Sequence, residues 1–441
     1  MMRRRFSLLG LFAMLVLVAA ACGGGGGGET GAAGTTGGGA ECGSGSISLM
    51  GIWVATEQQS IQAVIDGFQE QCPDVTVKYN PAGDNLVTVL ATAVQGGNPP
   101  DLATIAQPAT VGEYVDKGAL KPIDFAADVV KENYSDDLVQ QGTFDGKLYG
   151  FFFKGANKST VWYNVPVFQD AGVEPPKTWD EFLAAAKTIK ASGVPAYSIG
   201  GADGWTLTDL FENIYIRQAG PEKYDQLAKH EIPWTDQSVK DALTTMADVL
   251  GDTDNIAGGT QGALQTDFAT SVTNAFADPP KAAMVIEADF VAGEIVNSTT
   301  AKPETGFNVF DFPSINDSPP AVVGAGDMVV MFKDSPAAQA FVNYLATPEA
   351  AEIWVKRGGF SSPNKNVPPD AYPDSILRST ATALASAETF RFDLSDLQPS
   401  AFGGTVGQGE FKLFQDFLAN PSDVDGIAQK LEDAATAAYK G

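Results

Sequence analysis

From residue 46 onward, short apolar segments typical of β-strands alternate with longer amphipathic segments typical of α-helices. Residues 46–54 are apolar and β-prone, and residues 58–71 carry apolar side chains at helical spacing. Apolar and polar side chains then alternate over 75–80, the period of a half-buried strand, before a second helical pattern at 86–94. Glycines and prolines at 96–100 are expected to end that helix. This alternation favours an α/β fold with helices packed on a mainly parallel sheet.

A second stretch with the same organisation begins after residue 153. Thr178 and Glu181 are spaced as a capping box, which predicts that an amphipathic helix begins there. The chain has 441 residues, and a single hydrophobic core seldom grows beyond about 250–300. We therefore predict two α/β lobes.

The first 45 residues are predicted to lie outside both lobes. Arginines at 3–5, an apolar run at 8–18 and three alanines have the pattern of a secretory signal peptide over residues 1–21. Residues 18–22 resemble a lipobox, whose cysteine, here Cys22, is lipidated and becomes the new N-terminus. Residues 22–45 would then be a glycine-rich, lipid-attached tether. Ordinary secretion without lipid is the alternative that the sequence leaves open.

Two further cysteines, Cys42 and Cys72, remain once Cys22 is assigned to lipid. An even number of cysteines in an exported protein predicts one disulfide. Two free thiols remain the alternative, because the sequence does not show whether the Cα atoms come within bridging distance. The formal net charge of −26 argues against nucleic acid as a partner.

The sequence offers little for a catalytic or metal site that depends on histidine. His230 is the only histidine, and it lies in a polar stretch that predicts a solvated surface position. Residues 252–255 lack the glycine and terminal glutamate of a calcium loop. We expect no catalytic residue, no metal and no cofactor. Glycoside hydrolysis, which needs only two suitably placed carboxylates, stays open as a remote alternative.

Several short motifs follow one another from residue 47 to the C-terminus. They are GIW at 51–53, PDVTV at 73–77, NPPD at 98–101, GALKP at 118–122, GKLYG at 146–150, WYN at 162–164, PPKTWDE at 175–181, KAAM at 281–284 and YLATPE at 344–349. In this order and spacing they resemble the family 1 extracellular solute-binding proteins, a group that includes maltose-binding and other carbohydrate-binding receptors.

The resemblance implies a periplasmic-binding-protein fold of type II, with two lobes joined by a hinge. The N-terminal lobe would comprise residues 46–153 and about 318–362, and the C-terminal lobe about 154–317 and 363–441. Ligand would bind in the cleft between them, in line with the general preference of ligands for domain interfaces.

The resemblance also implies a function, that of the substrate-binding component of an ABC transporter. Such a protein is expected to be a monomer, anchored by its lipid to the outer face of the cytoplasmic membrane, that delivers a carbohydrate to a permease. An α-glucoside or small oligosaccharide is the expected cargo. Polyamines, polyols and glycerol phosphodiesters are alternatives on the same scaffold. The arginines Arg217, Arg357 and Arg391 stand outside the candidate loops, which disfavours a phosphate.

Sugar receptors stack aromatic rings on the C–H faces of the sugar and aim polar side chains at its hydroxyls. The glycine-flanked loop 200–206 offers Asp203 and Trp205, which the resemblance assigns to these two roles. Trp53, Glu57 and Gln58 stand where the first strand meets the first helix. Further candidates are Glu287 and the preferred Asp289, together with Gln107, Lys154, Asp327 and Phe402.

Overall fold

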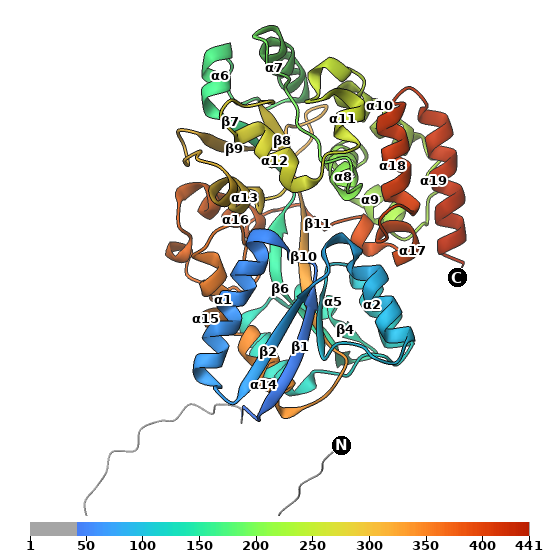
Figure 1. The fold of residues 1–441 in the computed structure, drawn as a ribbon. Helices are drawn as coiled ribbons and strands as arrows, with labels where there is room; N and C mark the ends of the chain where they lie inside the picture. Colours follow the sequence, from blue (N-terminus) through green and yellow to red (C-terminus); the bar gives the residue numbers. More distant parts are fainter. Residues whose placement is uncertain (1–41, 441) are drawn as a thin grey trace, which may run out of the picture. The chain divides into compact units, whose positions relative to one another are not determined.

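The computed structural model describes residues 42–440, which form two lobes around separate sheets (Figure 1). The predicted signal peptide, Cys22 and residues 23–41 of the predicted tether lie outside the described residues. Within 42–440, no helix is both long enough and apolar enough to cross a membrane.

The first lobe is built on a six-stranded sheet whose strands come from distant parts of the chain. They are β1 (Gly45–Gly51), β2 (Val75–Pro81), β3 (Leu102–Ile105), β6 (Gly150–Asn157), β10 (Val322–Met331) and β11 (Phe390–Phe392). The order is β11-β10-β3-β1-β2, and β6 also pairs with β10. β1 is parallel to β2 and β3, whereas β10 runs parallel to β11 and antiparallel to β3 and β6.

Helices cover both faces of this sheet (Figure 1). Alternate residues of β10 show this, because Val329 and Met331 pack into one apolar core while Met328 and Val330 pack into another. The first core contains α1, α4, α14 and α15, and the second contains α2 and α3. The helices of this lobe are α1 (Ala55–Gln71), α2 (Leu86–Gln95), α3 (Pro108–Asp116), α4 (Ala127–Asn133), α5 (Asp136–Gln141), α14 (Pro336–Leu345) and α15 (Pro348–Val355), beside a small hairpin of β4 (Thr143–Phe144) and β5 (Lys147–Leu148).

The second lobe has a three-stranded sheet in the order β8-β7-β9 and a larger share of helices. Its strands are β7 (Thr160–Asn164), β8 (Met284–Ile286) and β9 (Phe307–Asp311). The helices are α6 (Val165–Ala171), α7 (Trp179–Ala191), α8 (Trp205–Ala219), α9 (Pro221–Ala228), α10 (Gln237–Leu250), α11 (Gly259–Ala263), α12 (Phe268–Phe276), α17 (Ser400–Gly403), α18 (Gly409–Ala419) and α19 (Val424–Ala438). Two more, α13 (Val291–Ser298) and α16 (Ser375–Ala385), pack against the core that contains α1.

The capping box predicted at the start of α7 is confirmed. The Thr178 hydroxyl accepts a hydrogen bond from the backbone N–H of Glu181, and the Glu181 carboxylate accepts from the backbone N–H of Thr178. Trp179 then stacks on Phe182 at a centroid distance of 5.3 Å. The local sequence therefore sets both the first residue of this helix and the face that it buries.

The α/β class is confirmed, but the expectation of mainly parallel sheets is wrong. In the second lobe β7 pairs antiparallel with both β8 and β9, and the first sheet is mixed. Strand direction depends on how long connections return, and β10 re-enters the first sheet only after the chain has passed through all three strands of the second sheet. Periodicity within a segment does not encode that return path.

The chain passes between the lobes along buried strands. β6 leads through Lys158 and Ser159 directly into β7, and the whole stretch from 150 to 164 is buried. β10 accompanies β6 in antiparallel register, with Lys154 opposite Asp327. The limits proposed for each lobe, near residues 153, 318 and 362, stay a prediction.

Cys42 and Cys72 are joined by a disulfide, with their Cα atoms 5.5 Å apart. Cys72 is the C-cap residue of α1, and Cys42 precedes β1. The bond therefore ties the segment entering the first sheet to the end of the first helix. It closes a loop of 30 residues.

Removing this disulfide should destabilise the first lobe. Replacing both cysteines by serine frees a 30-residue loop in the unfolded chain, which should lower the free energy of unfolding by about 3 to 4 kcal/mol. Urea denaturation of the oxidised protein and the double variant measures this difference. Reduced wild-type protein is the matched control, since it should unfold with the variant, and equal stability of all three forms would contradict the prediction.

Candidate functional site

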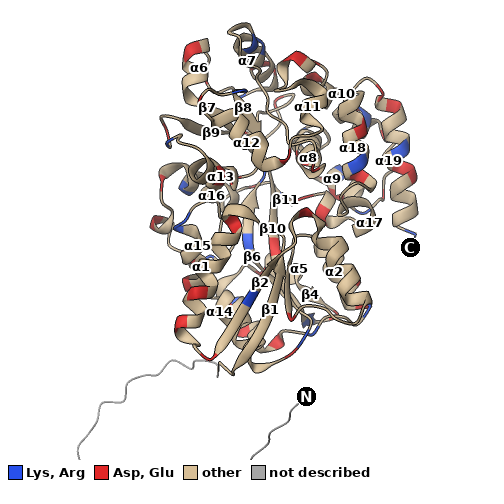
Figure 2. Cartoon of the chain, in the orientation of Figure 1, with Lys and Arg blue, Asp and Glu red and all other residues tan. Residues whose placement is uncertain are grey.

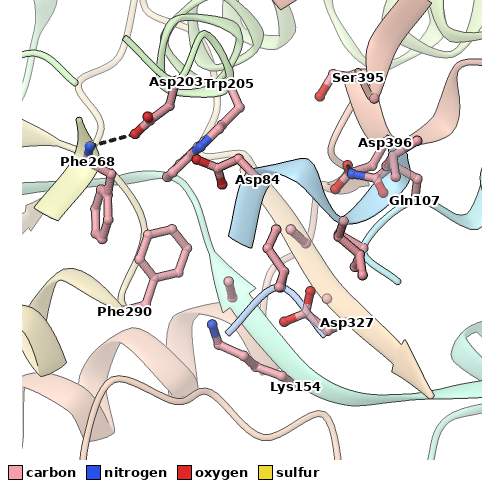
Figure 3. Close-up of a pocket in the computed structure, with 18 of the residues that line it drawn as sticks. Asp84, Gln107, Lys154, Asp203, Trp205, Phe268, Phe290, Asp327, Ser395 and Asp396 are labelled. Atoms are coloured by element: carbon pink, nitrogen blue, oxygen red, sulfur yellow. Dashed lines mark hydrogen bonds between the residues drawn. The ribbon is translucent and has the colours of Figure 1, made fainter. Parts of the chain in front are cut away.

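A cavity of about 410 Å³ opens between the two lobes. The first lobe contributes the segment after β1, the turn before α2 and the segment after β3, while the second contributes the starts of α8, α12 and α13. The floor comes from the passing strands β6 and β10 (Figure 3). Strand ends and helix starts from both lobes thus meet at the cavity, as is common for ligand sites in α/β proteins.

Three aromatic rings form a wall on the second-lobe side. Trp205, Phe268 and Phe290 stand at the starts of three different helices, with centroid distances of 5.4, 6.0 and 5.1 Å. Gly204 makes the turn into α8 possible, because its φ is +85° and an added Cβ would lie 2.7 Å from Cβ of Phe411. The wall offers flat apolar surface to a ligand.

Carboxylates surround one end of this wall. Asp203 and Asp267 come from the second lobe, and Asp84 reaches in from the turn at Gly83–Asn85 of the first lobe (Figure 3). Asp203 accepts a hydrogen bond from the backbone N–H of Phe268 at 2.6 Å. Burial, and then the negative charge of Asp84, raise the pKa of Asp203 to about 7, although the Phe268 bond lowers it.

An ion pair lies at the other end of the cavity, on β6. Lys154 pairs with Glu57 of α1, and its ammonium lies 4.9 Å from the ring centroid of Phe290. Burial lowers the pKa of Lys154, but Glu57 and Asp327 raise it further, so the side chain stays charged. Asp327 also accepts a hydrogen bond from Nε1 of Trp53 at 2.7 Å. One ammonium thus lies among two carboxylates, and each carboxylate accepts a hydrogen bond, Glu57 from Lys154 and Asp327 from Trp53.

A second buried lysine connects the lobes beneath the cavity. Nζ of Lys158 contacts Asp209 of α8 at 2.8 Å and Asp393, which follows β11. Burial raises the pKa of Asp393, but the Lys158 ammonium and its hydrogen bonds lower it below its usual value overall. Burial raises the pKa of Asp209 despite the same ammonium. Nearby, Gln107 donates to Asp396 at 3.0 Å.

Oxygens of Asp209, Glu212 and Asp393 lie within 4.8 Å of one another, a spacing that suits metal ligands. The Lys158 ammonium already contacts two of these three carboxylates. Glu212 accepts hydrogen bonds from Tyr224 and from the backbone of Leu394 and Ser395. Each of the three carboxylates thus contacts at least one hydrogen-bond donor of the protein.

Six of the residues singled out in the sequence line the cavity. They are Glu57, Gln107, Lys154, Asp203, Trp205 and Asp327. They come from both lobes and from the passing strands. Because they lie far apart in the sequence, no local pattern shows that they meet at one cavity. Their role as ligand contacts stays a prediction.

The fold does not bring five other candidates to the cavity surface. Gln58 points to solvent from α1, and Trp53 is fully buried behind Asp327. Phe402 packs against Trp234 in the second-lobe core. Asp289 accepts hydrogen bonds from Ser361 and the backbone of Asn157, and Glu287 lies buried next to Asp209. For the four buried side chains, Trp53, Phe402, Asp289 and Glu287, distant segments set the burial or the partners.

Several lining residues escaped the sequence analysis. They are Asp84, Asp267, Phe268, Phe290, Lys158, Asp396 and Phe411. Asp84 had a usable signal, since it follows β2 in a Pro-Ala-Gly turn at a strand end. Asp267 had another, because its side chain caps α12 by accepting from the backbone N–H of Thr270. The sequence around Lys158 gives no signal that this residue lines the cavity.

His230 is less exposed than its polar neighbourhood predicted. Its Nε2 lies 3.1 Å from a carboxylate oxygen of Glu432, and its ring lies 5.0 Å from that of Tyr439. The last helix thus covers a side chain that the local sequence placed in solvent. His230 does not line the cavity.

The family model for bacterial extracellular solute-binding proteins matches residues 54–352. The chain is 32% identical over 373 residues to the osmoprotective compounds-binding protein GgtB of Synechocystis, covering 83% of this chain and 86% of that protein. It is also 32% identical over 397 residues to the alpha-glucosides-binding periplasmic protein AglE of Rhizobium meliloti, covering 87% and 85%.

Solved structures show the same fold at lower identity. A chitin oligosaccharide binding protein superposes with a TM-score of 0.77 at 22% identity, covering 90% of this chain and 100% of its own. The bacterial solute receptor AcbH, described as preferring β-D-galactopyranose, gives a TM-score of 0.80 at 20% identity with the same coverage. The two-lobed periplasmic-binding-protein fold is thereby confirmed.

The buried charges around Lys158 yield a stability prediction. Lys158→Met should lower the free energy of unfolding by about 3 to 5 kcal/mol, because it leaves buried carboxylates without their cation. In the variant, Asp209 and Asp393 should have folded-state pKa values above those of the unfolded chain. Stability from such groups is lost as pH rises, so the deficit should shrink as pH falls from about 7 to about 4. Urea denaturation over this pH range measures it.

Lys190→Met is the matched control for this experiment. Lys190 pairs with Asp252 at 2.7 Å, with side chains that are 34% and 50% exposed. An exposed pair of this kind contributes about 1 kcal/mol or less. Equal losses in the two variants would contradict a special role for the buried pair.

Proposed function

Because the chain belongs to the family of bacterial extracellular solute-binding proteins, we propose that it is the carbohydrate receptor of an ABC importer. It captures a sugar in the cavity between its lobes and presents it to a membrane permease. An α-glucoside or a small oligosaccharide is the proposed cargo. The name of one relative, the alpha-glucosides-binding periplasmic protein AglE, supports a ligand of this class.

The single observation that carries this proposal is an aromatic wall with carboxylates at one end of the same cavity. Trp205, Phe268 and Phe290 offer a surface for the C–H faces of a sugar ring, while Asp84 and Asp203 offer acceptors for its hydroxyls. The cavity volume of about 410 Å³ lies within the range of about 300–1,000 Å³ common for small-molecule sites.

Among non-sugar ligands, a glycerol phosphodiester is the least suited to this cavity. Within the described part of the chain, no arginine lines it, and the lysines that line it contact carboxylates, Lys154 with Glu57 and Lys158 with Asp209 and Asp393. Figure 2 shows acidic positions spread over both lobes. A polyamine or a polyol therefore remains the runner-up class.

Binding rather than hydrolysis is the proposed activity. Carboxylates occur in the cavity, so a hydrolytic pair is the alternative that must be tested. We expect the protein to hold its sugar without cleaving it and to close around it by a hinge movement at the passing strands. Recovery of the intact sugar after long incubation, shown by chromatography, separates the two activities.

We further propose that lipid on Cys22 holds the receptor at the outer face of the cytoplasmic membrane. The described chain enters β1 at the end opposite to the cavity, since β1 runs from Gly45 toward the lining residues Ile52 and Val54. Seven residues of strand separate the two ends by about 20 Å. The tether proposed for residues 22–45 would thus join the described chain at the end of β1 that is remote from the cavity. Globomycin-sensitive processing and mass spectrometry of the mature N-terminus test this arrangement.

Thermal unfolding in the presence of sugars, polyols and polyamines tests the receptor assignment. A true ligand at 100 times its dissociation constant should add about 2.7 kcal/mol to the free energy of unfolding. One saccharide, or a few related ones, should raise the unfolding midpoint. Stabilisation by polyamines alone would leave the fold unchanged and overturn the carbohydrate assignment.

Trp205→Ala should weaken binding of the sugar so identified by about tenfold to hundredfold, which is the effect of losing one buried aromatic face. Isothermal titration calorimetry measures the change. Phe125→Ala is the control, because Phe125 is an exposed aromatic residue of the first lobe outside the cavity. Unchanged affinity in Trp205→Ala would remove the aromatic wall from the binding site.

A further inference from the structure

Asp84 belongs to the first lobe but lies close to the carboxylates that the second lobe contributes to the cavity. It lies in the short turn Gly83–Asn85 between β2 and α2, and it lines the same cavity as Asp203, Asp267 and Trp205. Figure 3 shows the indole nitrogen of Trp205 directed at the Asp84 carboxylate. The end of the cavity is therefore built jointly by both lobes.

The electrostatics of this end differ from those of the floor. Burial raises the pKa of Asp84, and the Trp205 side chain partly offsets this as a hydrogen-bond donor. Asp84 in turn raises the pKa of Asp203. The two lysines that line the cavity contact other carboxylates, Glu57 on one side and Asp209 and Asp393 on the other. Asp84 and Asp203 thus repel each other unless a donor lies between them.

The hydrogen-bonding capacity of Asp84 and Asp203 also indicates that a ligand donor lies between them. When ionised, carboxylates only accept hydrogen bonds, and Asp203 offers more lone pairs than the backbone N–H of Phe268 occupies. A ligand group that lies between the two ionised carboxylates must therefore donate in both directions, and such a donor favours the ionised forms that burial disfavours. Neighbouring sugar hydroxyls can do so, and an ammonium group can as well, whereas a carboxylate or phosphate on the ligand would add a third negative charge.

We propose that Asp84 is a specificity-determining residue that acts across the cavity with Asp203, so that the pair binds a hydroxyl-bearing, uncharged part of the sugar and rejects anionic sugars. This inference rests on the proposed function, since it concerns the same cavity. It adds a residue of the first lobe to the recognition site. It also specifies which class of carbohydrate is refused.

The test compares three probes on the full exported protein by titration calorimetry. They are the best neutral sugar of the stability panel, its uronic acid and its amino-sugar analogue. Wild type should bind the uronic acid at least about a hundredfold more weakly than the neutral sugar, because desolvated like charges face each other. Asp84→Asn should weaken binding of the neutral sugar by about tenfold. It should also reduce the ratio of the affinities for the neutral sugar and the uronic acid by about tenfold.

Two further variants make the result specific. Asp203→Asn should reduce the same discrimination, because it removes the other charge of the pair while keeping an oxygen for the Phe268 N–H. Asp66→Asn removes a charge from an exposed position on α1 and should leave affinity and discrimination as in wild type. Unfolding midpoints confirm that each variant is folded at the titration temperature.

The outcomes separate this inference from the proposed function. If wild type binds a neutral sugar but Asp84→Asn keeps the wild-type discrimination, the role of Asp84 is overturned and the receptor stands. Tight binding of the uronic acid by wild type overturns the exclusion of anions. A preference for the amino sugar over the neutral one overturns the uncharged ligand. If no carbohydrate binds wild type at all, the proposed function fails first.

Discussion

The antiparallel pairing of β6 with β10 is the contact on which the rest of the structure depends. Both strands lie in the first sheet and pass toward the second lobe, so their register fixes the floor of the cavity. Lys154 lies opposite Asp327, and the register shifts between Asp327 and Met328. Irregularities of this kind re-aim a side chain, and here Asp327 both lines the cavity and accepts the Trp53 indole N–H.

The passage of β6 between the lobes also explains why Lys154 and Lys158 are buried. Strands that pass through the middle of the molecule carry two lysines into a region with little water, where an isolated ammonium would be costly. Carboxylates from α1, α8 and the segment after β11 meet these lysines and keep them charged. The same burial raises the pKa values of Asp84 and Asp203, and the negative charge of Asp84 raises that of Asp203 further. One cavity therefore has a floor where lysines contact carboxylates and an end where carboxylates lie without a lysine contact among the described residues.

The candidate site was predictable where local sequence and strand ends coincide. Asp203 and Trp205 stand in a glycine-flanked loop before a helix, and Glu57 follows the first strand, so their placement at the cavity follows from the α/β pattern. Phe402 and Glu287 have similar local settings, yet they lie in the interior because helices from elsewhere cover them. Phe268 and Phe290 join Trp205 from positions more than 60 residues away along the chain.

By itself the sequence determined the α/β class, the division into two lobes, the capped start of α7 and the family, because these depend on periodicity and on short motifs. The sequence also predicted the disulfide between Cys42 and Cys72, which the structure confirms. Only the tertiary structure decided strand direction in the second sheet and which carboxylates meet Lys158. It alone brought Asp84 to face Asp203 across the cavity. The physical reason is that pairing, burial and charge repulsion depend on distances between segments, and these distances exist only once the chain has returned through β10 to its first sheet.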